Sequence, residues 1–184
     1  SNANLNRTIL TNTILRNTDL NDASFEAAVF DDTTLETDKL TSLEDADLRE
    51  FDLKQIEDQI QDGDVALTGV NLKGKRIKNI NLSNAELSEA QFQGARLNDV
   101  TLSGSNLHKA NFFNSKIIDS YFENEVDLDQ AVLDEAEIRF SRFNDASLIS
   151  ASLKDATIVG GRLDRVNLES AELNETRFQN LGLQ

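Results

Sequence analysis

Residues 67–122 read LTGVN LKGKR IKNIN LSNAE LSEAQ FQGAR LNDVT LSGSN LHKAN FFNSK IIDSY F, so every fifth residue from Leu67 to Phe122 is Leu, Ile or Phe. The same spacing resumes one residue out of step at Leu128 and continues to Leu183. A period of five matches neither the 3.6 residues of an α-helical turn nor the two-residue alternation of a flat strand. It indicates a short unit that cannot bury its apolar side alone and must stack on copies of itself.

The residues around each large apolar residue, which we call the centre of the unit, also repeat. Two residues before the centre the side chain is usually small, as at Ala85, Ala90 and Ala95, and the residue between the two is often Asn, Asp, Ser or Glu. Alternation along a strand places the centre and the small residue on one face and the residue between them on the other. The two residues after the centre are mostly polar and must turn the chain, because the next unit begins at once.

Units such as AEL at 85–87, ANF at 110–112 and AEL at 171–173 resemble the A-(D/N)-L-x-x units of the pentapeptide-repeat family. The resemblance covers nearly the whole chain. It implies an all-β fold, a right-handed, four-sided parallel β-helix in which four units make one square coil. Members of the family range from DNA mimics that protect topoisomerases to proteins of unknown role, so the resemblance implies a fold rather than one activity.

The number of units predicts the size of the rod and the filling of its core. Thirty-five centres from Leu5 onward give about nine coils, which at strand spacing form a rod about 40 Å long. Large and small inward side chains should fill the interior at ordinary packing density, so we expect no enclosed small-molecule site. The spacing also predicts two stacks of core rings on opposite walls, one of Phe92 and Phe112 and the other of Phe122 and Phe143.

We treat residues 4–184 as one β-helix domain with two irregularities. The spacing fails in the interruption at 41–66, where Leu53, Ile56 and Ile60 would share one side of a helix that ends at Gly63. This predicts a short helical or loop interruption around residues 54–66, and a longer helix from Ser42 is the alternative. One extra residue near Glu125 is most simply a bulged corner.

The two ends of the chain lead to two further expectations, one about the N-terminus and one about self-association. Residues 1–3, Ser-Asn-Ala, resemble the remnant of a cleaved expression tag, so we expect the native N-terminus to be missing and leave them out of fold reasoning. Stacked strands expose unpaired backbone groups at both ends of a rod unless a cap covers them. Because the repeat runs from Leu5 to Leu183, we expect end-to-end self-association into a homo-oligomer, or a covering segment in the native protein.

Composition disfavours several classes of function. With 33 acidic against 18 basic residues the net charge is −15, which disfavours direct binding to nucleic acid or to an anionic membrane. No stretch approaches the roughly 20 apolar residues of a membrane span, so we expect a soluble protein of unassigned compartment. There is no Cys, and His108 is the single histidine, so a zinc site would need carboxylates around one imidazole. We expect no metal, no cofactor and no catalytic residue.

One local motif is best read as coincidence. Gly69–Lys75 fits the phosphate-loop pattern G-x4-G-K, but Arg76 stands where Ser or Thr is required and Leu72 is a centre of the repeat.

One wall of the rod carries the candidate interaction surface. At four units per coil, six basic residues fall on this wall: Arg76, Lys78, Arg96, Lys116, Arg139 and Arg177. An apolar cluster rimmed by charge is typical of a contact surface. The candidate surface therefore consists of Arg96, Lys116, Ile118, Arg139, Phe140 and Val159. The alternative is a solvated wall balanced by Asp99, Asp119 and Glu137, with Phe140 tucked into a corner.

On the adjoining wall Tyr121, Arg142 and Arg162 should stack, more as local stabilisation than as a binding site.

These observations favour a non-catalytic protein–protein interaction solenoid with an unidentified protein partner. The alternative is an acidic DNA mimic that binds a type II topoisomerase (DNA gyrase), because acidic residues concentrate at 44–64 and around the bulge at 123–137. The basic wall interrupts that acidity. The DNA mimics of the family dimerise through a helix after the repeat, whereas here the repeat runs to Leu183, so we expect no such helix.

Overall fold

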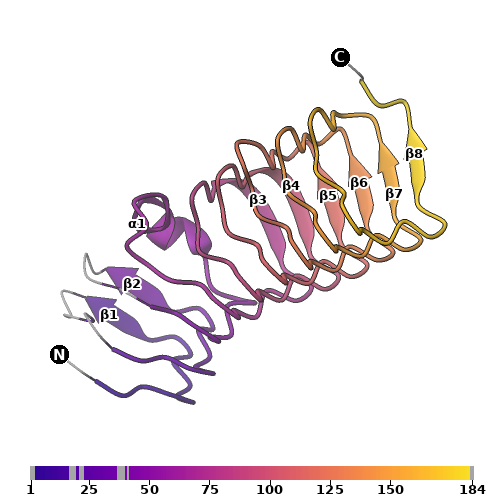
Figure 1. The fold of residues 1–184 in the computed structure, drawn as a ribbon. Coiled ribbons are helices and arrows are strands. Elements are labelled where there is room, and N and C mark those ends of the chain that lie inside the picture. The colour runs from indigo at the N-terminus through magenta and orange to yellow at the C-terminus, as the bar shows by residue number, and fades with distance from the viewer. Residues whose placement is uncertain (1–2, 17–19, 21–22, 37–39, 41, 183–184) are drawn as a thin grey trace.

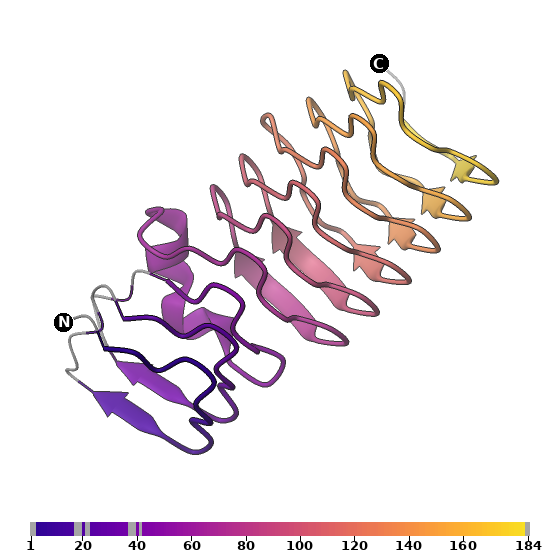
Figure 2. The same cartoon turned by 60° about the horizontal axis from the view of Figure 1, so that its bottom comes forward.

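The computed structural model describes residues 3–16, 20, 23–36, 40 and 42–182, and they form the predicted parallel β-helix (Figure 1). The regular strands of the described residues lie on one wall and stack along the rod (Figure 2). They are β1 (Ile14–Arg16), β2 (Thr34–Glu36), β3 (Arg76–Asn81), β4 (Arg96–Thr101), β5 (Lys116–Ile118), β6 (Glu137–Arg139), β7 (Thr157–Val159) and β8 (Arg177–Gln179). Each pairs in parallel with the next in the sheets β1–β2 and β3–β8.

The predicted number of coils can be checked on a neighbouring wall. There a ladder of parallel bridges runs through nine described residues: Ile9, Val29, Asp47, Asn71, Gln91, Asn111, Val132, Ser152 and Glu172. Nine levels joined by about eight turns agree with the predicted nine coils. Most steps are 20 residues long, which is four units of five.

The corners of the coils explain why the second residue after most centres is polar or glycine. At Asn79, Asp99 and Asp119 the backbone lies in the left-handed region, with φ of 51°, 55° and 49°. Asn, Asp and Gly adopt this conformation at the lowest cost, and a turn with positive φ at this position lets the next strand start at once.

The preference for Asn or Asp before the centre has a hydrogen-bonding cause. On the walls that contain only isolated bridges, the backbone N–H of the residue directly after the centre has no backbone acceptor in the neighbouring coil. The side-chain oxygen of Asn106 accepts that N–H from His108 at 3.0 Å, and Asn111 accepts it from Phe113 at 3.0 Å. In the A-(D/N)-L pattern the alanine therefore packs inward, while the Asn or Asp side chain accepts a backbone N–H that would otherwise be unpaired.

The core contains the two predicted ring stacks. Phe92 and Phe112 are stacked with their centroids 4.5 Å apart, and Phe122 and Phe143 are stacked at the same distance. The two stacks also meet inside the rod, where Phe112 and Phe122 pack edge to face with a centroid distance of 6.2 Å. All four rings are buried, so the prediction of an apolar, stacked interior is confirmed.

The interruption forms a short helical segment, as predicted. A 3-10 turn, η1 (Leu53–Ile56), leads into α1 (Glu57–Gln61), and the buried side chains are Leu53, Ile56 and Ile60. Gly63 follows with φ of +76°. The alternative of a longer helix from Ser42 is wrong, because residues 43–48 keep the repeat: Leu43, Ala46 and Leu48 all point into the core.

The helical segment stands where a strand of the third coil would lie, between β2 and β3 (Figure 1). Gln55 supplies part of the missing pairing. Its Oε1 accepts the N–H of Leu35 at 2.7 Å, and its Nε2 donates to the carbonyl of Thr33 at 3.0 Å. On the other side Glu57 accepts the N–H of Asn81 at 2.6 Å. Side chains of the helix thus replace backbone ladder bonds on both sides of the gap.

The extra residue near Glu125 lies in a widened corner. Asn124 and Glu125 both have positive φ, of 58° and 62°, whereas corners such as those at Asn79 and Asp119 have one such residue. The ladder resumes directly afterwards with the bridge from Asn106 to Asp127. The inward pattern is therefore restored, and the next rings, Phe122 and Phe143, still stack.

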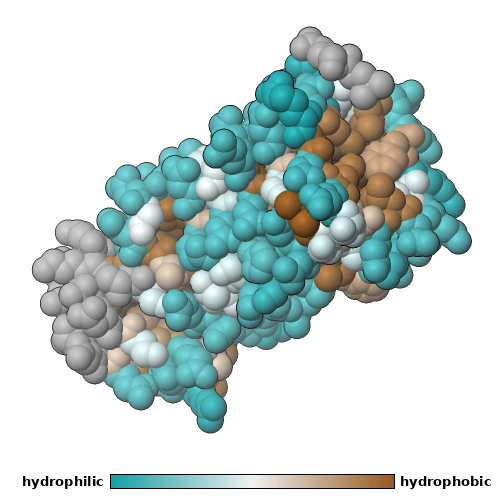
Figure 3. Space-filling model, in the orientation of Figure 1, coloured by the Kyte–Doolittle hydropathy of each residue, from teal (hydrophilic) through white to brown (hydrophobic). Residues whose placement is uncertain are grey.

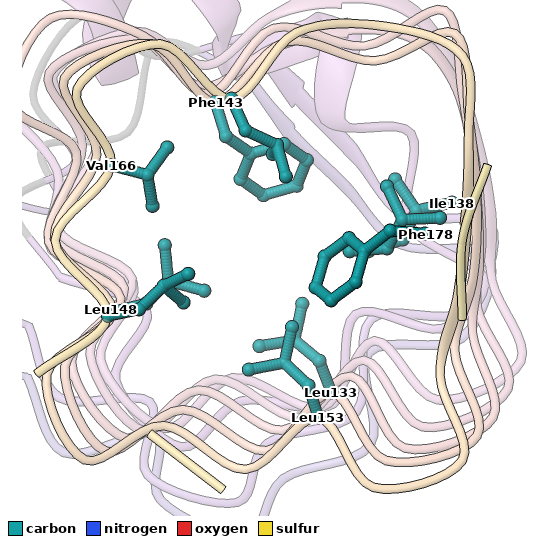
Figure 4. A pocket seen from close by; sticks show the side chains of 10 residues that line it. Leu133, Ile138, Phe143, Leu148, Leu153, Val166 and Phe178 are labelled. Atoms are coloured by element: carbon teal, nitrogen blue, oxygen red, sulfur yellow. The ribbon is translucent and has the colours of Figure 1, made fainter. Parts of the chain in front are cut away.

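The last coils contain a small apolar hollow of about 10 Å³, which is too small for a small-molecule ligand. It lies between side chains of several walls, among them Phe143, Leu153, Val166 and Phe178 (Figure 4). Phe178 is 41% exposed because no described coil packs above it, and apolar side chains gather at this end of the visible face (Figure 3). End-to-end association of the rod stays a prediction.

Candidate functional site

The β3–β8 wall brings together the basic residues that the repeat had placed on one wall. Strand register aligns Arg76, Arg96 and Lys116 in one row, which continues through Glu137, Thr157 and Arg177. A second row contains Lys78, Asn98, Ile118, Arg139, Val159 and Gln179. The six candidate surface residues therefore share this wall or its corner.

One carboxylate compensates two cations of the candidate surface. Glu137 accepts from Lys116 Nζ at 2.6 Å, and its other oxygen lies 2.5 Å from Arg139 Nη2. The bond from Lys116, helped by the charges of both cations, holds the pKa of Glu137 below its usual range despite some desolvation. The expected balance by Glu137 is thus present, and it leaves Lys116 and Arg139 as parts of an ion-pair network.

The cations nearer the helix lack such compensation. Within the described part of the chain no salt bridge reaches Arg76, Lys78 or Arg96. Like charges directly opposite one another on neighbouring strands are destabilising. A shallow depression lies over these positions and is lined by Arg76, Lys78, Arg96, Leu97, Asn98, Lys116 and Ile118.

Phe140 is exposed at a corner of this wall. Its side chain is 60% exposed, and its backbone has φ of 54°. Equivalent corners carry Asn79, Asp99 and Asp119, for which the left-handed region is less costly than for a bulky aromatic residue. The alternative in which Phe140 is tucked into a corner does not match this exposure.

The ring of Phe140 lies against the next corner, Gly160. A Cβ on Gly160 would stand 2.7 Å from Cδ1 of Phe140, so the glycine makes room for the ring. Val159 and Ile118 are half-buried beside these corners. The result is a small apolar surface with Phe140 at its most exposed point and the Glu137 network beside it.

A family model for pentapeptide repeats matches the chain with eight copies, over residues 1–36, 66–104, 80–117 and 92–124. The chain belongs to the pentapeptide-repeat family. No curated protein sequence matches it.

Solved structures of other pentapeptide-repeat proteins are similar to this chain. Rfr23 from the cyanobacterium Cyanothece 51142 is 20% identical, with 65% of this chain and 91% of that chain covered and a TM-score of 0.48. HetL from Nostoc sp. strain PCC 7120, involved in heterocyst differentiation regulation, is 20% identical, with 95% and 86% covered and a TM-score of 0.27. QnrB1, a plasmid-mediated fluoroquinolone resistance protein, is 14% identical, with 99% and 92% covered and a TM-score of 0.44. Such identities describe the fold alone.

The other candidates of this pentapeptide-repeat protein have structural roles. Lys75 of the phosphate-loop-like motif donates to the carbonyls of Arg49 at 3.0 Å and Phe51 at 2.6 Å, and its burial lowers its pKa. It ties the chain before the helix to β3. Nδ1 of His108 lies 4.0 Å from a carboxylate oxygen of Asp127, and the described residues contain no cluster of potential metal ligands. None of the described helices is long and apolar enough to cross a membrane.

The predicted stack on the adjoining wall is also present. Parallel bridges join Tyr121 to Arg142 and Arg142 to Arg162. The guanidinium carbon of Arg142 lies 5.4 Å from the centroid of the Tyr121 ring, and Arg162 Nε lies 3.8 Å from an oxygen of Asp164. Both arginines thus have local partners, as expected of a stabilising ladder.

Sequence reasoning missed two contributors to this wall. Asn98 lines the depression between the cations, although its polarity alone gave no reason to select it. Gly160 accommodates the ring of Phe140, and its position twenty residues later, one coil on, is the signal that could have revealed it.

Proposed function

We propose that this pentapeptide-repeat protein is a non-catalytic scaffold that binds a partner protein through the β3–β8 wall. The observation that carries the proposal is Phe140, an exposed aromatic residue at a left-handed corner. Backbone strain of this kind persists where the surrounding structure supports it, and it clusters at functional sites. Aromatic residues, phenylalanine included, are also enriched in protein interfaces relative to the rest of the surface.

The surroundings of Phe140 support the same proposal. Val159 and Ile118 extend the apolar surface, and the cations Arg96, Lys116 and Arg139 lie around it on the same strands. An apolar centre with a polar, charged rim is the usual anatomy of an interface. The partner would bury the ring of Phe140 centrally and pair with the arginines at the rim.

Affinity capture from a lysate of the source organism tests this surface. The baits are the wild type, Phe140→Ser, Arg96→Glu/Lys116→Glu and the control Phe113→Ser, which alters another exposed phenylalanine on a different wall. We expect partners that the wild type and Phe113→Ser capture equally and that the other two baits lose. Equal recovery by all four baits would show that the wall is merely solvated.

The DNA mimic remains the second candidate because of one property, the net charge of −15. A mimic needs acidity spread along the rod, whereas here the β3–β8 wall is basic near the helix. A supercoiling assay with purified DNA gyrase separates the two functions. Inhibition or protection of gyrase by the wild type at stoichiometric concentration would favour the mimic over the scaffold.

A further inference from the structure

The helical interruption makes the basic part of the wall concave. η1 and α1 stand out from the rod next to β3 (Figures 1 and 2). One depression at the foot of the helix is lined by residues that include Leu53, Lys54, Arg76 and Lys78, and Arg76 and Lys78 also line the depression over β3–β5. Together the two depressions form what we call the basic groove, defined by Lys54, Arg76, Lys78, Arg96, Asn98 and Lys116.

Three of the carboxylates near the groove already have partners, while Asp99 in β4 and Asp119 directly after β5 stand exposed at corners. Asp52 accepts the backbone N–H of Lys54 at 3.0 Å and thereby caps η1. Glu57 accepts both Asn81 N–H at 2.6 Å and Lys54 Nζ at 2.8 Å. Glu137 is bound to Lys116 and Arg139. Among the cations of the groove, those that have no salt bridge to a described residue are thus Arg76, Lys78 and Arg96, side by side on β3 and β4.

The chemistry of these side chains favours carboxylates as ligands. Two guanidinium groups on adjacent strands present planar donor forks that match carboxylate geometry, and Lys78 adds a point charge. Neighbouring strands are about 4.8 Å apart, so the row from Arg76 to Lys116 spans about 10 Å. Alternate residues of an extended peptide are about 6.8 Å apart, so two same-face carboxylates fit within that span.

We propose that the basic groove binds an acidic, extended segment of the partner protein, with two or more of its carboxylates paired to Arg76 and Arg96. This inference rests on the proposed function and specifies the partner's chemistry. A protein segment fits better than nucleic acid because the cations are few and local, while the chain as a whole carries a charge of −15 that repels a continuous phosphate backbone.

Fluorescence anisotropy with a labelled octa-glutamate peptide tests the groove directly at 50 mM and 300 mM salt. An uncharged Gly-Ser peptide and a single-stranded octathymidylate serve as the comparison probes. The variant is Arg76→Gln/Arg96→Gln, and the matched control is Lys73→Gln/Lys109→Gln, which removes the same charge from other walls. Thermal unfolding of each variant checks that the fold is retained.

We expect the acidic peptide to bind the wild type and the lysine control alike, and the arginine variant at least about tenfold more weakly, with binding reduced at high salt. The proposal is overturned if the wild type does not bind the peptide at 50 mM salt, or if both double variants bind it equally. Tighter, arginine-dependent binding of the octathymidylate would overturn it in favour of nucleic acid.

The experiment separates this proposal from the proposed function. Phe140→Ser leaves the groove cations in place, so it should bind the acidic peptide like the wild type while losing the captured partner. If the peptide fails to bind but Phe140→Ser still loses the partner, the scaffold function stands and only the acidic segment is refuted.

Discussion

Gln55 holds the interrupted coil to its neighbour, and its removal has a calculable cost. Its amide accepts from the N–H of Leu35 and donates to the carbonyl of Thr33, two bonds that a strand would otherwise make with β2. Leu35 and Thr33 are both buried, so water can replace the amide only poorly after Gln55→Ala. An unsatisfied buried group costs about 1–3 kcal/mol, and two of them give an expected loss of about 2–6 kcal/mol in the free energy of unfolding.

Urea unfolding followed by circular dichroism measures the loss, and amide hydrogen exchange at Leu35 reports the bond itself. Gln55→Glu keeps the accepting oxygen but loses the N–H donor, so we expect about half the loss, roughly 1–3 kcal/mol. Asp58→Ala, exposed on α1 of the same segment, should change stability by less than about 0.5 kcal/mol. If Gln55→Ala matches the Asp58 control and the Leu35 amide stays protected, Gln55 does not substitute for a strand.

Three further predictions concern the core, the exposed corner and the ion-pair network. Phe112→Ala should cost about 3–5 kcal/mol in urea unfolding because it removes a fully buried ring from its stack with Phe92; a loss under about 1 kcal/mol would contradict the packed core. Gly160→Ala should be destabilising, since the added Cβ would stand 2.7 Å from Phe140, and Phe140→Asn should relieve part of the loss in a double-mutant cycle. The ionised form of Glu137 is the one bound to Lys116, so its stabilising contribution should be lost as the pH falls through the lowered folded-state pKa of Glu137. In Lys116→Gln the pKa of Glu137, measured by NMR, should rise. An unchanged pKa would exclude the bond between the two side chains.

Much of the fold could be predicted because the repeat itself carries the geometry. Once four units make a coil, residues twenty apart must lie on the same wall, which is why Arg76, Arg96 and Lys116 align in one row. The ring stacks follow from the same arithmetic. The helix near Leu53 was predictable from its apolar spacing, since its inward side must fill the space of the missing strand.

The remaining features depend on single side-chain contacts that no period encodes. Gln55 looks like an ordinary solvated residue in the sequence, and only the position of the β2 edge gives it two backbone partners. Glu137 lies in a row of cations, but whether it pairs with one or two of them is decided by side-chain reach. The groove beside the helix likewise required the position of α1 relative to β3, which the failed spacing of residues 41–66 left open.

A repeat fold supplies its own comparison for each unusual residue, because equivalent positions sit in nearly the same surroundings. The corner position of Phe140 is occupied elsewhere by Asn79, Asp99 or Gly160, which adopt positive φ at less cost. The row in which Arg76 lies opposite Arg96 also contains Glu137, two strands beyond Arg96. The fold therefore accepts an acidic residue in this row, and a row of alternating charge would fit it as well as the row of cations does. Packing requires neither departure, and both lie on the β3–β8 wall. Two locally unfavourable choices on one wall are most simply explained by a partner that contacts them both, and for this reason we place the partner there rather than on the more acidic walls.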